Sequence, residues 1–227
     1  MIPPNKLSTL VFRSIAVCST LLSMVTLGQP VRAATVTGLY NTGFSNTGAN
    51  LPVGAADVDY NIITAVGPFT TGPALVVDPA TVVPQGWLPD TLVSHWIGPK
   101  VDQTFGQMNG TAGLYIYRTD PFTVSGGGTA TIAGRWAMDN EATMFLIDNA
   151  IGVRNQVTLL TSGFSAWSGF TLPPLAQGSY HLECDVNNFS NATGLRVEDV
   201  IPSIPEPSTI ALLLCSVAVL LGKQRRR

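Results

Sequence analysis

The chain has 227 residues, of which 45% are hydrophobic and only 11% are charged, and its formal net charge is −2. Most basic residues lie near the two ends, so residues 34–201 carry five basic against thirteen acidic side chains, a net charge of −8. A segment this acidic offers no surface that could follow a phosphate backbone, which argues against any nucleic-acid partner.

The N-terminus has the pattern of a secretory signal peptide. Lys6 and Arg13 precede the apolar stretch Ile15–Leu27, as in a basic region followed by a hydrophobic one. Val31-Arg32-Ala33 places small or tolerated residues at positions −3 and −1, which predicts cleavage after Ala33. Residues 1–33 are therefore predicted to direct export through the Sec translocon, followed by cleavage by signal peptidase.

Residues 34–201 are predicted to form one domain built from β-strands. Short runs rich in β-branched and aromatic residues alternate with Gly, Pro and Asn clusters, with no helical spacer between them. This pattern predicts an all-β fold, an antiparallel β-sandwich with a jelly-roll closure. The expected strands are 58–66, 74–77, 81–83, 93–97, 113–124, 129–138, 142–147, 153–160, 168–172, 179–186 and 193–200.

A succession of short motifs accompanies these strands: Ser94–Pro99, Gly113–Thr119, Gly134–Asn140, Phe145–Asn149, Val186–Asn188 and Thr193–Glu198. This succession resembles the galactose-binding-like jelly-roll modules of many exported bacterial proteins. The chain has Ile147-Asp148-Asn149 where family members often have Leu-Asn-Gly. The resemblance implies a jelly-roll module of the kind that also occurs beside glycoside hydrolases.

Oxygen-bearing side chains cluster near two predicted turns. Asp139, Asn140 and Glu141 surround the first turn, and Asp148 with Asn149 begins the second. Calcium binds six to eight such oxygens, so Asp139 and Asp148 are candidate ligands for a structural calcium ion. The alternative is that these residues cap tight turns through hydrogen bonds to their own backbone.

The tryptophans and the cysteine divide into expected core and expected surface. Trp96 and Trp136 lie within predicted strands, as does Cys184, which shares the apolar face of its strand with Leu182 and Val186, so all three are expected in the core. Trp87 and Trp167 fall in predicted loops and are the candidates for stacking against a sugar ring.

Catalytic motifs with a recognisable mechanism are missing from the sequence. It contains no Gly-x-Ser-x-Gly, His-Glu-x-x-His or P-loop pattern, and its two histidines, His95 and His181, fall in predicted strands. Glu183 and Asp185 share one strand face, which is expected to be solvated. We therefore expect no enzymatic activity and no cofactor.

The C-terminal residues 202–227 have three parts in a fixed order. Pro205-Glu206-Pro207 is followed by a short apolar run that ends at Gly222, and then by Lys223-Gln224-Arg225-Arg226-Arg227. The apolar run is predicted to form a single transmembrane helix, with the arginines at the cytoplasmic face. As a helix, Ser208–Gly222 would span roughly 22 Å, less than the roughly 30 Å of a bilayer core, which favours a temporary anchor over a permanent one.

This tail resembles the PEP-CTERM sorting signal of exported bacterial proteins. The resemblance implies recognition of Pro205, Glu206 and Pro207 by an exosortase, a membrane-embedded processing enzyme. An ordinary short membrane anchor and a buried helix are the alternatives. The expected protein is exported from a Gram-negative-type bacterium, held transiently in the inner membrane and then placed at the cell surface or in the matrix.

The expected function is that of a non-catalytic structural or carbohydrate-binding module, with exopolysaccharide as the expected ligand. Two alternatives differ in class. One is a purely structural or adhesive surface protein without a small ligand, and the other is a glycan-active enzyme whose motif is not visible in the sequence.

Overall fold

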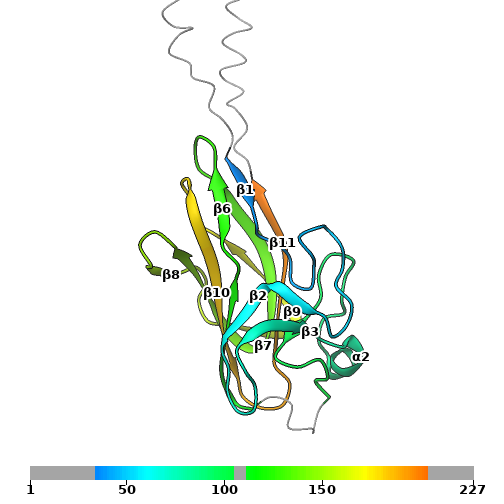
Figure 1. The fold of residues 1–227 in the computed structure, drawn as a ribbon. Helices are drawn as coiled ribbons and strands as arrows, with labels where there is room; N and C mark the ends of the chain where they lie inside the picture. Colours follow the sequence, from blue (N-terminus) through cyan, green and yellow to red (C-terminus); the bar gives the residue numbers. More distant parts are fainter. Residues whose placement is uncertain (1–33, 105–110, 204–227) are drawn as a thin grey trace, which may run out of the picture. The chain divides into compact units, whose positions relative to one another are not determined.

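A computed structural model describes residues 34–104 and 111–203, and these residues form an all-β fold in which every strand pairing is antiparallel (Figure 1). The prediction of an all-β, antiparallel fold is confirmed. The predicted signal peptide with its cleavage site at Ala33, and the predicted sorting motif with the apolar run behind it, lie outside the described residues. Among the described residues no helix is long and apolar enough to cross a membrane.

Within the described residues, eleven strands belong to one hydrogen-bonded sheet. They are β1 (Thr35–Thr37), β2 (Ala56–Thr64), β3 (Gly72–Val76), β4 (Ile97–Gly98), β5 (Gly113–Thr119), β6 (Phe122–Ser125), β7 (Thr131–Asp148), β8 (Arg154–Gln156), β9 (Thr161–Thr171), β10 (Gly178–Asn188) and β11 (Gly194–Ser203).

The sheet closes on itself through β7. The first half of β7 pairs with β11 and β9, and the second half pairs with β10 and β8. The path β10-β5-β2-β3-β4-β11-β7 therefore returns to β10 as a continuous hydrogen-bonded circuit. This closure leaves one shared interior for side chains from strands that are far apart in sequence.

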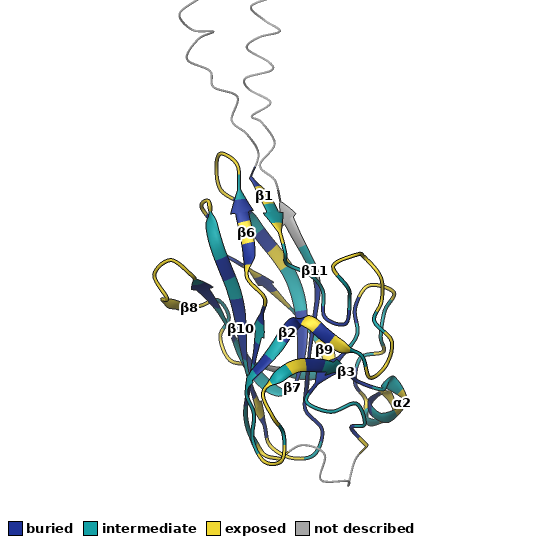
Figure 2. Cartoon of the chain, in the orientation of Figure 1, coloured by how far each residue is buried: buried dark blue, intermediate teal, exposed yellow. Residues whose placement is uncertain are grey.

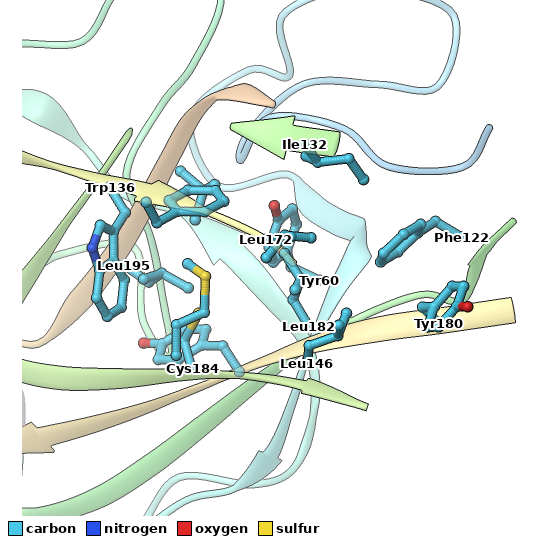
Figure 3. Close-up of a cluster of buried hydrophobic side chains, with 14 of the residues drawn as sticks. Tyr60, Phe122, Ile132, Trp136, Leu146, Leu172, Tyr180, Leu182, Cys184 and Leu195 are labelled. Carbon is cyan, nitrogen blue, oxygen red and sulfur yellow. The ribbon is translucent and has the colours of Figure 1, made fainter. Parts of the chain in front are cut away.

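The interior is filled by the main hydrophobic core. Alternating residues of β10, among them Leu182, Cys184 and Val186, point inward and are buried, as the sequence pattern predicted. Trp136 from β7 and Tyr60 from β2 are also fully buried in this cluster (Figure 3). Each large apolar side chain buried in this way stabilises the fold by about 1.5–3 kcal/mol relative to exposure.

A second, smaller core lies around Trp87 and Trp96. It contains Val77, Val82, Trp87, Trp96, Ala137 and Ala192. Its helical part is α2 (Pro79–Val82) followed by the 3₁₀ turn η1 (Val83–Gln85). Trp96 is 1% exposed, so its predicted core position is confirmed.

The prediction of a strand at 81–83 was wrong, because the local sequence caps a helix. The Asp78 side chain accepts a hydrogen bond from Ala80 N at 2.9 Å, and Pro79 occupies the first helical position. An acidic N-cap followed by proline is a strong helix start, and it outweighs the β propensity of Val82 and Val83.

Several strand boundaries also differ from the prediction: only Ile97 of the expected strand 93–97 lies in a strand, the expected 153–160 is reduced to Arg154–Gln156, and the expected 168–172 begins earlier, at Thr161. The expected strand 113–124 is broken at Asp120-Pro121 into β5 and β6, since proline cannot donate to a ladder. Conversely, the expected turn at 139–141 does not exist, because β7 runs without a break from Thr131 to Asp148. Its pairing register with β9 shifts on both sides of Met138, so the strand accommodates irregularity there instead of turning.

Candidate functional site

A pocket of about 420 Å³ lies where the second core meets the middle of β7. Its lining comes from the η1 turn, β7, the start of β9 and the loop between β10 and β11. Its lining includes Gln85, Trp87, Asp139, Asn140, Phe164 and Asn191. The volume falls within the range of about 300–1,000 Å³ typical of small-molecule sites.

The aromatic wall of this pocket is formed by Trp87 and Phe164. The Trp87 ring lies 4.4 Å from the Trp96 ring and 6.3 Å from the Phe164 ring, measured between centroids. A Cβ atom at Gly194 would come within 2.9 Å of the Trp87 ring, so the indole packs directly on the β11 backbone. Trp87 is only 3% exposed, so its ring is fixed in place and does not project into solvent as a loop side chain would.

The turn that carries Trp87 is set by local chemistry. Gly86 ends the η1 turn with a φ of 91°, a left-handed conformation that glycine adopts without strain. The next backbone amide, Leu88 N, donates to Phe164 O at 2.8 Å, which ties this turn to β9. The two aromatic residues are therefore held together by both backbone and ring contacts.

Asp139 supplies the one ionisable side chain among the described residues that line the pocket. Its side chain is 4% exposed, and its Oδ1 atom has no hydrogen-bond partner among the described residues. Burial raises the pKa of Asp139 to about 7, although hydrogen bonding to the Asn140 and Trp87 side chains opposes the rise. A buried, ionised carboxyl group without a charged partner destabilises the fold unless a cation or a hydrogen-bond donor compensates its charge.

Polar side chains on three other elements complete the rim. Gln85 donates from Nε2 to the backbone oxygens of Thr81 and Gln103, and Asn140 Oδ1 accepts from Phe189 N at 2.7 Å. Asn191 donates to Ser190 Oγ at 3.1 Å and has a φ of 63°. These amides line the same pocket as the aromatic wall and give it a polar rim.

Trp167, the second predicted sugar contact, occupies a different place. It lies within β9 and not in a loop, and it does not line the Trp87 pocket. The guanidinium carbons of Arg135 and Arg196 each lie 4.8 Å from the centre of its ring. Two cations over one indole favour a packing role, with Trp167 covering a charged network.

That network is centred on Arg196, which is completely buried. Its guanidinium donates to Ser94 Oγ at 2.8 Å, to the Pro89 carbonyl and to Glu198 Oε2 at 3.1 Å. Burial alone would raise the pKa of Glu198, but hydrogen bonds from Ser94, Arg135 and Thr91 lower it. The network ties the loop that follows Trp87 to β11 and is structural.

Asp139 and Asp148, the predicted calcium ligands, are not brought together. They lie nine positions apart on the same extended strand, which corresponds to roughly 30 Å. Asp148 Oδ1 instead accepts from Ala150 N at 2.9 Å, the turn-capping alternative. Within the described parts of the chain, no group of three or more acidic, histidine or cysteine side chains could hold a metal ion.

A second pocket, of about 400 Å³, was not anticipated from the sequence. It is lined in part by Arg118, Arg154, His181 and Glu183. Glu183 is not solvated as predicted, because its side chain accepts from Arg118 Nε and from Arg154 Nε, each at 2.6 Å. Arg154 also pairs with Asp185, so the two cations and two anions largely neutralise one another. These partners come from β5, β8 and β10, and no local sequence signal joins them.

The Trp87 pocket is therefore the best candidate site: it joins one predicted sugar contact, Trp87, with one predicted metal ligand, Asp139. Phe164 and Asn191 were missed, because only the pairing of β7 with β9 and β11 brings them to the same place. No protein-family model matches this chain, and no curated protein is significantly similar to it.

Proposed function

We propose that this chain is an exported, non-catalytic surface or matrix protein whose β domain binds carbohydrate in the Trp87 pocket. The observation that carries the proposal is the pairing of a fixed aromatic wall, Trp87 and Phe164, with an amide rim at Gln85, Asn140 and Asn191. Sugar rings present apolar faces and hydroxyl edges, and apolar sites with a few placed polar groups recognise such ligands.

The jelly-roll topology, the signal peptide and the sorting tail are part of the same proposal. The circuit formed by β7 and β10 is compatible with a jelly-roll sandwich of the galactose-binding-like kind. The sequence patterns at the two ends support delivery by a signal peptide and sorting by an exosortase at Pro205-Glu206-Pro207. Exopolysaccharide of the cell surface is the proposed ligand source.

The proposal of a non-enzyme is supported by how the histidines are used. His95 Nδ1 lies 2.7 Å from Asp90 Oδ2, an arrangement that could orient a catalytic base. The adjacent Ser94 hydroxyl, however, donates to Glu198 and accepts from Arg196, so it belongs to the buried network and not to a nucleophile–base pair.

Binding can be tested with the full chain purified in mild detergent and a panel of immobilised polysaccharides. The Trp87→Phe variant keeps an aromatic side chain in the second core but reduces the ring surface that lines the pocket. We expect it to weaken retention on the polysaccharide at least fivefold. Trp167→Phe is the matched control, because Trp167 lies outside the pocket, and it should bind as the unaltered chain does. Equal retention of both variants, or retention of no polysaccharide by the unaltered protein, would refute the proposed site.

A further inference from the structure

The charge pattern of the Trp87 pocket narrows the class of ligand it can take. Among its described lining residues, Asp139 is the single ionisable group, and no lysine, arginine or histidine lies beside it. The carboxyl group keeps one oxygen, Oδ1, buried without a hydrogen-bond donor. The amide side chains nearby are already committed to Phe189 N, Ser190 and backbone carbonyls.

A neutral sugar could satisfy the hydrogen-bonding capacity of Asp139 but not its charge. A hydroxyl group could donate one hydrogen bond to Oδ1, but it would bring no positive charge to stabilise the ionised carboxylate. A protonated amine supplies both a positive charge and up to three donors. Phe164 also lines the pocket, and a cation over an aromatic face is attracted by the ring quadrupole.

We propose that the Trp87 pocket recognises a sugar that carries a free amino group, with the ammonium placed against Asp139 Oδ1. This inference rests on the proposed carbohydrate binding and names the class of sugar: a hexosamine unit of a polysaccharide that is not N-acetylated. Burial raises the pKa of Asp139 and so favours its neutral form in the empty pocket, and an ammonium group of the ligand would supply the positive charge that stabilises the ionised carboxylate.

The remaining contacts fit a sugar better than a bare amine. The aromatic wall is wider than an ammonium group needs, and the hydrogen-bonding capacity that Asn140 and Asn191 keep beyond their bonds to Phe189 N and Ser190 could serve ring hydroxyls. Recognition would then combine one charged contact with stacking and amide contacts, so the charge determines which sugar binds.

The test uses two oligosaccharides of equal length, a fully deacetylated glucosamine trimer and its N-acetylated counterpart. Binding to the full chain is measured by isothermal titration calorimetry at pH 7. We expect the amine-bearing trimer to bind at least tenfold more tightly. The Asp139→Asn variant keeps the side-chain shape and removes the charge, so it should reduce this preference to less than about twofold.

Asp148→Asn is the matched control, because Asp148 lies on the same strand outside the pocket, and it should keep the tenfold preference. Circular dichroism and a thermal melt of each variant establish that it is folded. If Asp139→Asn does not fold, competition by Nα-acetyl-lysine amide against the trimer on the unaltered chain provides the second measurement. The lysine derivative should compete at least tenfold less well than free glucosamine.

The outcomes separate the two proposals. If the N-acetylated trimer binds as tightly as the amine, or the lysine derivative competes equally well, the amino-sugar inference is overturned while carbohydrate binding or amine binding stands. If neither trimer binds and no polysaccharide is retained, the proposed function fails as well.

Discussion

Replacing the buried Arg196 with methionine should destabilise the domain strongly, because it would leave a carboxylate in the interior with fewer partners. Arg196 is 0% exposed and Glu198 is 2% exposed. The substitution removes the contact from Arg196 Nη2 to Glu198 Oε2 at 3.1 Å and the bonds to Ser94 Oγ and the Pro89 carbonyl. Breaking one side of a buried ion pair costs about 3–5 kcal/mol.

The cost should fall near the lower end of that range. Arg135 Nη2 still donates to Glu198 Oε1 at 2.6 Å, and Thr91 Oγ1 donates to Oε2 at 3.0 Å. The Leu88 carbonyl loses a long bond from Arg196 Nη1, at 3.5 Å, but keeps the Trp96 Nε1 donor at 2.8 Å. We therefore expect a loss of about 3 kcal/mol in the free energy of unfolding.

Equilibrium unfolding in urea, followed by tryptophan fluorescence, measures this loss. The double variant Arg196→Met with Glu198→Leu removes both charges and should recover at least half of it, since apolar replacement of a whole buried pair is often close to neutral. A single variant that loses less than about 1 kcal/mol would refute the buried network. So would a double variant less stable than the single one.

Three further predictions concern titration, thiol chemistry and sorting. Burial raises the pKa values of Asp57 and Asp139 to about 7 each. The contribution of these two groups to stability is therefore greatest below about pH 4, where both are neutral, and the free energy of unfolding falls by roughly 4 kcal/mol per group as pH rises through 7. Thermal melts from pH 5 to 8 should therefore show falling stability, less steeply for Asp139→Asn; a flat profile would contradict this. Cys184, buried and with a raised pKa, should react with a thiol reagent only after unfolding, as absorbance assays would report; labelling of the native protein would contradict its core position. Glu206→Ala should block processing of the tail, so intact mass spectrometry should recover the unprocessed C-terminus; an unchanged mature mass would remove Glu206 from the recognition motif.

Local pattern was sufficient where the periodicity of a strand decides which residues are buried. The alternation of Leu182, Cys184 and Val186 correctly predicted one buried strand face, because that periodicity is fixed by the pleat. Pattern was insufficient at Asp78-Pro79, where a cap outweighed the β propensity of the residues behind it. This capping signal is present in the sequence and predicts a helix start at Pro79.

The candidate site was harder to predict, because it depends on pairings between distant strands. Asp139 was expected in a turn, yet it pairs with Gly194 in the middle of a long strand, and that pairing brings it to Trp87. Nothing within a few residues of Asp139 indicates this partner. The same holds for Trp167, whose two arginine neighbours come from β7 and β11.

The two ends of the described chain lie close together. Thr35 pairs with Ser125 and Ser203 pairs with Thr131, so β1 begins and β11 finishes beside the short β6–β7 loop, at one pole of the domain (Figure 1). Exposed residues mark that loop, and the buried residues of β7 and β10 extend away from it (Figure 2). Gly194, beside Trp87, lies nine residues up β11 from Ser203, roughly 30 Å away. If the Trp87 pocket binds carbohydrate as we propose, the ligand would therefore meet the domain near the end of β11 that lies away from Ser203.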